Sequence, residues 1–421
     1  MIVSFPYTGV APVDVPDKNL IAVVGPRDGA AAAEPGAVVR AALDQPVGSP
    51  PLRALAGSAR KALILFDDNT RPTPAHLIVP WLLEELHRGG VKDVAFLAAS
   101  GTHRTMTPSE KEGKLGAGVC QAYEVLDHRW DDPSQLVTME GAGSSVPVEV
   151  NRLVLDADLL VGVGHVAPHR MAGFGGGAKI VQPGVCGAAT TGRTHWMAAQ
   201  FRSADLLGQA VNPVRTEMER VAEVVGLRAV FNVVLNTRNE MAACFFGAPV
   251  PVHRRAAGLA AEIFGARVPA LADIVLIESF PGDLDMWQAS KALAAAELMV
   301  RPGGMVILVT PCPEGVSGEH PAMLEFGYQS PARVAEWVGA GVLTDLLVAA
   351  ELAVGGRIVR ERARGILVSP GILPEETQQL GFEWAASPSE ALDRALHRVG
   401  PDARVLVVRH GGEILPLVDA G

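Results

Sequence analysis

The sequence predicts two α/β domains built on parallel-type sheets. Its 421 residues exceed what one ordinary hydrophobic core holds, so two domains are the starting expectation. Apolar, strand-like runs alternate with helix-like runs, and this alternation favours parallel sheets covered by helices. The alternation restarts near residue 268. We therefore expect a first domain over residues 1–268, a second over residues 269–403, and a return of residues 404–421 to the first domain.

Composition narrows the class of protein. Hydrophobic residues make up 48% of the chain and charged residues 19%, which is typical of a folded globular protein. The net charge of −10 argues against a nucleic-acid binder. The four cysteines are far apart and form no CxxC pair, which favours reduced thiols over disulfides or a zinc site. Neither an export signal nor an apolar run of roughly 18 residues is visible, so we expect a cytoplasmic protein that binds no membrane.

In the first domain, each strand-like run is followed by a polar loop and then by a helix-like run. The sequence TPSE at residues 107–110 is a capping box, which marks the start of one helix. Pro80 lies inside another helix-like run and predicts a kink or a later start. The expected strands span residues 62–66, 91–100 and 157–166, and the helix that contains Pro80 spans residues 75–90.

Loops that leave the carboxyl ends of parallel strands meet at one edge of a sheet, where ligands bind. This rule brings together Asp68 and Arg71 from the first loop, His103 from the second and His169 from the third. Arg71 is suited to forking onto a carboxylate or phosphate, and Asp68 to orienting a neighbouring imidazole. The alternative for the first loop is an ordinary turn with a solvated arginine.

The second domain repeats the plan. We expect strands over residues 273–280 and 304–310, with a helix over residues 288–300 between them. Gln288 and Lys291 are three residues apart on that helix, so both can reach the same ligand.

A glycine-rich stretch over residues 169–184 stands out because it carries no carboxylate. No Asp or Glu occurs between Asp158 and Asp205, although the chain as a whole is acidic. Glycines let backbone N–H groups approach an anion closely, so we expect an anion to bind there. The basic side chains from residue 169 to residue 195 are His169, Arg170, Lys179, Arg193 and His195.

Two nucleotide-binding motifs are approximated but not met. GVGHVA at residues 162–167 fits a loose GxGxxA pattern, but the acidic residue about 20 positions further on is missing and Pro168 breaks the expected helix. GFGGGAK at residues 173–179 resembles a phosphate loop, but Ala178 and Ile180 replace the residues that flank the lysine of a Walker A motif. His165, near the end of an apolar strand, is expected to be structural.

Five separated segments together resemble the lactate racemase family, the nickel-pincer 2-hydroxyacid racemases and epimerases. The resemblance covers roughly residues 5–415 and implies two α/β domains with the active site in the cleft between them. Trp287 and Phe174 depart from the family pattern at positions that affect pocket shape. The five segments are DDNTRPTP, ASGTHRTMT, GHVAPHRMAGFGGGAKIVQPGV, TTGRTH and WQASK, in that order.

The resemblance also implies a cofactor and roles for matching residues. The cofactor is a nickel-carrying pyridinium-3,5-bisthiocarboxylic acid mononucleotide, the nickel-pincer nucleotide, joined covalently to Lys179. His195 matches the protein ligand to nickel, and His103 and His169 match the acid/base pair. The residues implied to surround the cofactor are Asp68, Asn69, Thr70, Arg71, Gln288 and Lys291, and Arg71, Gln288 and Lys291 also match substrate-binding positions.

These residue types suit racemisation of a 2-hydroxy acid. Removing the hydroxyl proton while a hydride leaves Cα avoids a carbanion beside a carboxylate. Two bases are then needed, and imidazoles with a pKa near about 6.5 can play either part. A lysine that is acylated must first be neutral, and Arg170 and Arg193 are expected to lower the pKa of Lys179.

The sequence leaves several points open. The substrate is a small 2-hydroxy acid, which could be lactate, a longer aliphatic or aromatic acid, a malate-like dicarboxylate or a sugar acid. The expected partners are cofactor-maturation proteins, including a nickel-insertion protein. The alternatives are an NAD(P)-dependent 2-hydroxyacid dehydrogenase and a non-catalytic nucleotide-binding protein.

Overall fold

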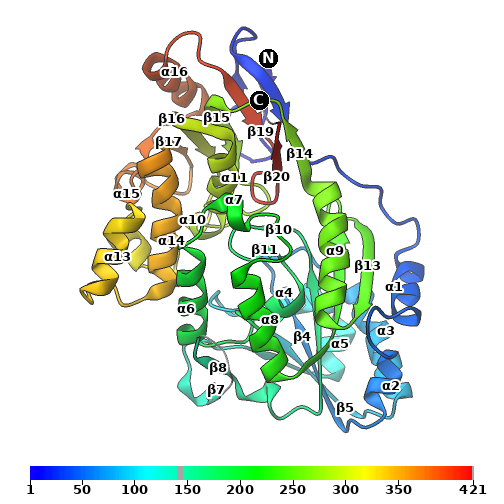
Figure 1. The fold of residues 1–421 in the computed structure, drawn as a ribbon. Coiled ribbons are helices and arrows are strands. Elements are labelled where there is room, and N and C mark those ends of the chain that lie inside the picture. The colour runs from blue at the N-terminus through cyan, green and yellow to red at the C-terminus, as the bar shows by residue number, and fades with distance from the viewer. Residues whose placement is uncertain (140–145, 420–421) are drawn as a thin grey trace.

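Two six-stranded sheets organise the chain, one above the other in Figure 1. The computed structural model describes residues 1–139 and 146–419. Residues 140–145 and 420–421, which fall inside the expected domain ranges, lie outside the described residues. One continuous apolar cluster includes Leu63 and Leu65 of the first sheet and Val275 and Ile277 of the second, so the two sheets share part of their core.

The first sheet has the order β13-β12-β9-β4-β5-β6, and only β13 runs antiparallel to its neighbour. From β4 the chain builds outward through β5 and β6, and it then crosses back to β9 on the other side. This reversal puts a topological switch point between β4 and β9, where ligands bind in open α/β sheets. The strands are β4 (Lys61–Phe66), β5 (Asp93–Ala98), β6 (Glu124–Asp127), β9 (Leu159–His165), β12 (Leu227–Leu235) and β13 (Met241–Gly247).

The strands expected in this part of the chain are confirmed to within about two residues at each end. The capping box is also present, because the Thr107 hydroxyl accepts from the Glu110 amide and the Glu110 carboxylate accepts from the Thr107 amide. The helix that contains Pro80 starts at Ala75 and runs through the proline, so the expected later start is wrong. The helices of this part are α1 (Pro35–Asp44), α2 (Leu52–Ala56), α3 (Ala75–Arg88), α4 (Pro108–Leu115), α5 (Ala117–Ala122), α6 (Ala188–Ala198), α7 (Ser203–Leu206), α8 (Pro213–Val225) and α9 (Pro249–Phe264).

The second sheet has the order β18-β17-β16-β15-β19-β3, and all its neighbours are parallel. Its switch point lies between β15 and β19. The expectation that residues 404–421 return to the first domain is wrong for β19, because β19 pairs with β15 and with β3 near the N-terminus. The strands are β3 (Leu20–Val24), β15 (Ala272–Glu278), β16 (Val300–Val309), β17 (Ala363–Val368), β18 (Glu383–Trp384) and β19 (Val405–Val408).

The helix expected over residues 288–300 forms as two short helices that meet at Ser290. None of the helices in the described ranges is long and apolar enough to cross a membrane. The helices of this part are α10 (Met286–Ala289), α11 (Lys291–Met299), α12 (Ala322–Phe326), α13 (Pro331–Gly339), α14 (Leu346–Gly356), α15 (Pro374–Leu380) and α16 (Pro388–Val399).

Four small two-stranded sheets are also present in the described part of the chain. One of them, β14 with β20, links the segment between the two large sheets to the end of the chain. The pairs are β1 (Ile2–Val3) with β2 (Val13–Asp14), β7 (Leu136–Met139) with β8 (Val148–Asn151), β10 (Pro168–His169) with β11 (Gly173–Phe174), and β14 (Gly265–Val268) with β20 (Leu415–Val418).

Candidate active site

One pocket, which we call the ligand pocket, is lined by segments that follow strands of both large sheets. The loop after β4 contributes Asp68 and Arg71, and the loop after β5 contributes His103. The chain after β9 contributes a histidine, a lysine and a further histidine on α6, and the short helices after β15 contribute an amide and a lysine. The predicted residues that line the ligand pocket are Asp68, Arg71, His103, His169, Lys179, His195, Gln288 and Lys291.

Asn69 and Thr70 do not line the ligand pocket, although they flank it in two adjoining pockets. The Asn69 side chain donates to Oε1 of Glu110 at 2.9 Å. The Thr70 amide donates to Oδ1 of Asp68 at 3.0 Å. These two residues therefore hold the loop, and the cofactor contact expected of them stays a prediction.

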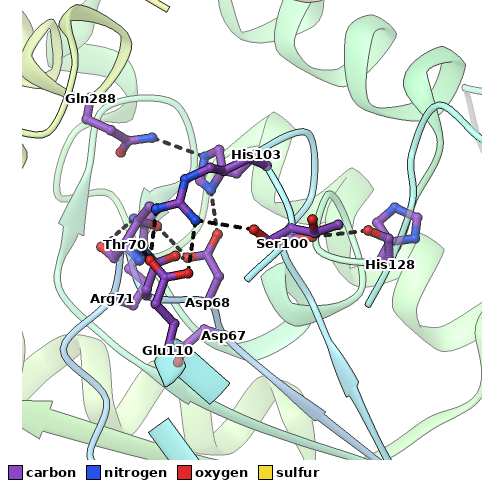
Figure 2. A network of polar contacts seen from close by, with 12 residues as sticks. Asp67, Asp68, Thr70, Arg71, Ser100, His103, Glu110, His128 and Gln288 are labelled. Carbon is purple, nitrogen blue, oxygen red and sulfur yellow. Dashed lines mark hydrogen bonds and ion pairs between the residues drawn. The ribbon is translucent and has the colours of Figure 1, made fainter. Parts of the chain in front are cut away.

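A chain of polar contacts crosses the pocket from the second sheet to the first. Lys291 donates to the Gln288 side-chain oxygen, and the Gln288 amide nitrogen lies 3.0 Å from Nε2 of His103. On the other side of the ring, Nδ1 of His103 lies 2.6 Å from Oδ2 of Asp68 (Figure 2). Because the Gln288 amide nitrogen can only donate, Nε2 of His103 is the acceptor and Nδ1 carries the proton.

Asp68 remains ionised in this arrangement. Burial opposes its charge, but His103 and Arg71 together lower the pKa of the carboxyl well below its usual range. An ionised carboxylate on Nδ1 orients the ring and stabilises an imidazolium, so His103 is set up to accept a proton at Nε2.

His169 is held in the opposite state. Its Nδ1 accepts from the amides of Met171 and Ala172, each at 3.2 Å, so the proton of the neutral ring is on Nε2. Burial, with the charges of Lys179 and Lys291, lowers the pKa of His169 well below its usual value. The two histidines thus differ: one presents a lone pair and the other presents an N–H.

Lys179 is a partly buried side chain at the pocket wall, in the short 3₁₀ helix Gly177–Ile180. Burial, then the charges of Arg71 and Arg215, lowers the pKa of Lys179 to about 7. The sequence pointed to Arg170 and Arg193 as the cause; Arg170 contributes less than Arg71 and Arg215, and Arg193 is not among the leading contributors. About half of the amine is therefore neutral, and able to act as a nucleophile, at pH 7.

His195 faces the pocket from α6. Its Nδ1 lies 2.8 Å from the carbonyl oxygen of Thr191, one turn earlier on the helix. A carbonyl oxygen only accepts, so Nδ1 carries the proton and Nε2 keeps its lone pair. Burial lowers the pKa of His195 to about 3, so the ring stays neutral, as a metal ligand must be.

Two buried cations clamp the loops that carry these groups. Lys114 of α4 donates to the carbonyls of Asp68 at 3.0 Å and Arg71 at 2.8 Å, and it pairs with Oδ1 of Asp67 at 2.7 Å. Arg215 of α8 donates to the carbonyls of residues 172, 174 and 176, which fixes the glycine-rich loop.

The glycines of this loop let its backbone pack closely against neighbouring residues. They do not leave a row of free backbone amides for a ligand. Gly176 has a φ of +68°, and a Cβ there would lie 2.5 Å from a Val166 methyl group. The amides of Gly175 and Gly177 already donate to the Ala167 carbonyl and the Asn232 side chain. An anion in the pocket would therefore rely on side chains such as Lys179 and Arg71.

Sequence reasoning missed several residues at or near the pocket. Lys114 and Arg215 act on backbone carbonyls, for which the sequence holds no signal. Arg170, expected to lower the pKa of Lys179, also forms a buried ion pair with Glu351. His165, expected to be structural, lines the pocket, and Glu413 lines an adjoining one. Loops that leave the carboxyl ends of parallel strands meet where ligands bind. Applied to the apolar run before HGGE (residues 410–413), this rule would have found Glu413.

Comparisons with known proteins agree with this geometry. Residues 8–205 match the lactate racemase N-terminal domain, and residues 268–415 match the lactate racemase C-terminal domain. The chain is 29% identical over 391 residues to a lactate racemase of Lactiplantibacillus plantarum, covering 89% of each chain. It is 27% identical over 314 residues to a lactate racemase of Thermoanaerobacterium thermosaccharolyticum, covering 73% of each.

Solved structures show the same fold. The lactate racemase apoprotein from Thermoanaerobacterium thermosaccharolyticum superposes with a TM-score of 0.87 at 24% identity, covering 99% of this chain and 100% of that one. A protein from Thermotoga maritima superposes with a TM-score of 0.70 at 22% identity, covering 89% of this chain and 100% of that one. The two domain matches together span most of the sequence, so the chain belongs to the lactate racemase family and is an enzyme of the racemase class.

Proposed function

We propose that the protein is a racemase or epimerase that inverts the C2 stereocentre of a 2-hydroxy acid, with a nickel-pincer nucleotide attached to Lys179. The observation that carries this proposal is that Lys179, His195, His103 and His169 line one pocket. The family relationship supports the racemase class, and the states of the four side chains support the finer assignment.

The residues present fit the cofactor. Lys179 offers a partly buried amine with a pKa of about 7 for the covalent link. His195 offers one imidazole nitrogen with a free lone pair, which suits nickel if the cofactor supplies the other donors. When bound, the cofactor would supply a group that takes a hydride from C2 and returns it.

The side chains of this protein would manage the protons. His103 takes the substrate hydroxyl proton at Nε2 and holds it, because Asp68 stabilises the imidazolium. His169 stays neutral and donates a hydrogen bond from its Nε2–H to the oxygen of the planar 2-keto acid on the opposite side. The imidazolium of His103 gives its proton back when the hydroxyl re-forms, so both rings end the cycle as they began it. Arg71 and Lys291 provide positive charge for the substrate carboxylate.

The proposal extends to partners and location. Enzymes that build the nickel-pincer nucleotide, including a nickel-insertion protein, are the expected partners, and a cytoplasmic location is consistent with that maturation.

A chirality-resolved assay tests the function. The protein is produced with cofactor-maturation enzymes and nickel, and each enantiomer of a set of 2-hydroxy acids is followed by chiral chromatography. We expect conversion of one enantiomer to an equal mixture, about one nickel per chain, and loss of both conversion and covalent adduct in Lys179→Ala. Nickel-free protein with full activity would refute the cofactor assignment.

The same preparation separates the two alternatives. A dehydrogenase would change the nicotinamide absorbance with a 2-hydroxy acid, while racemisation leaves it constant. A non-catalytic binding protein would show no turnover of any acid. The substitutions His103→Ala and His169→Ala would leave that result unchanged.

A further inference from the structure

Glu413 reaches the site on a tight turn after β19. The turn has the sequence RHGGE, and it folds back across the end of β15, where the Gly411 amide donates to the Glu278 carbonyl. A Cβ at Gly411 would lie 2.2 Å from that carbonyl oxygen, and one at Gly412 would lie 2.6 Å from the Ser279 carbonyl oxygen. Only glycines allow this approach, so the turn places Glu413 at the switch point of the second sheet.

Glu413 lines a second pocket that continues the ligand pocket. The two pockets share side chains that we assign to substrate and catalysis, namely Arg71, His169 and Lys291. Beyond these, prolines, glycines and Ala167 make up most of the lining of the second pocket, and polar side chains contribute the rest. Its other polar side chains are Asn69, Thr70, His165, Asn239 and Glu413.

His165 lacks a partner in this second pocket. Its side chain is 2% exposed, and its Nε2 is buried without a hydrogen-bond partner among the described residues. The nearest carboxylate oxygen is Oε1 of Glu413 at 4.0 Å, which is longer than a hydrogen bond. A buried polar nitrogen without a partner is costly, and a ligand group between the two side chains would remove that cost.

A hydroxyl group is the ligand chemistry that fits this gap. A hydroxyl both donates and accepts, so it can pair with the Glu413 carboxyl and with either tautomer of His165. An apolar tail would leave Nε2 of His165 unpaired, and a second carboxylate would lie beside Glu413. Burial raises the pKa of Glu413 to about 7, against the effect of Arg71 and Lys291, so the side chain is partly neutral at physiological pH.

We propose that Glu413 and His165 form a subsite for the tail of the substrate and select a monocarboxylic 2-hydroxy acid with further hydroxyl groups, as in glycerate and sugar acids. This inference rests on the proposed function, because it names the substrate class of the same site. It disfavours a malate-like dicarboxylate and a plain aliphatic tail.

The test compares three acids that differ only in the tail. Lactate, glycerate and malate carry a methyl, a hydroxymethyl and a carboxymethyl group on C2. kcat/KM for each is measured with nickel-loaded wild type, Glu413→Leu, Glu413→Gln and the control Glu262→Gln, which removes an exposed charge on α9. Circular dichroism and thermal unfolding check that each variant is folded.

We expect wild type to prefer glycerate over lactate by at least about tenfold, the factor that one charged hydrogen bond supplies. Glu413→Leu should abolish this preference. Glu413→Gln, which keeps a hydrogen-bonding side chain but no charge, should raise the malate-to-lactate ratio by about tenfold. Glu262→Gln should change neither ratio. An unaltered glycerate-to-lactate ratio in Glu413→Leu, or a wild type that prefers malate, would overturn the subsite.

Calorimetric binding of glycerate and lactate to the nickel-loaded protein separates this inference from the proposed function. If no acid is racemised but glycerate binds more tightly to wild type than to Glu413→Leu, the subsite stands and the racemase assignment fails. If acids are racemised with ratios that are insensitive to Glu413, the racemase assignment stands and the subsite fails.

Discussion

Lys114→Met should destabilise the protein far more than an ordinary lysine substitution. The ammonium group of Lys114 is 2.7 Å from Oδ1 of Asp67, and the two side chains are only 6% and 12% exposed. Methionine fills a similar volume but leaves the carboxylate buried without its cation. Breaking a buried ion pair in this way costs about 3–5 kcal/mol. The carbonyls of Asp68 and Arg71 also lose their donor, so the loop that positions Asp68 loosens.

Lys111→Met is the matched control. Lys111 lies on the same helix, and its ammonium is 2.5 Å from Asp127 in a pair whose side chains are 16% and 23% exposed. Water can replace the lost partner there, so we expect a cost of about 1 kcal/mol or less. Guanidinium unfolding of the two variants measures the difference. A similar loss in both would refute the clamp, and Asp67→Asn added to Lys114→Met should recover part of the stability, because the unpaired charge is gone.

Three further predictions concern the ligand pocket. The first concerns acylation of Lys179 by acetic anhydride in cofactor-free protein, measured by mass spectrometry. The extent of acylation should rise with pH to a half-maximum near pH 7, because the amine is neutral above its lowered pKa. A half-maximum near the usual lysine pKa of about 10.4 would contradict this prediction. His195→Ala should keep the covalent adduct in intact-mass spectra but lose nickel by elemental analysis, and an unaltered nickel content would reject the ligand assignment. Asp68→Asn should lower kcat by about 10²–10⁴-fold with a small effect on KM, because His103 loses the carboxylate that fixes its tautomer. If kcat and the pH profile were unaltered, the 2.6 Å contact between Nδ1 of His103 and Oδ2 of Asp68 would have no part in catalysis.

Part of the candidate site could be predicted because it follows local rules. Asp68, His103 and His169 each follow a strand, and the carboxyl ends of parallel strands converge whatever the rest of the chain does. The protonation states could not be predicted in the same way. The difference between His103 and His169 depends on which groups meet Nδ1, a carboxylate in one ring and two backbone amides in the other.

The sequence by itself determined the α/β class, the order of most strands and helices, and the motifs that mark the family, because each depends on residues close together in the chain. Only the tertiary structure decided that β19 and β3 complete the second sheet, and that Lys114 and Arg215 clamp the loops. The physical reason is the same in each case. Strand pairing, burial of a cation against backbone carbonyls and pKa shifts by desolvation all depend on partners distant in sequence, and local patterns carry no record of those partners.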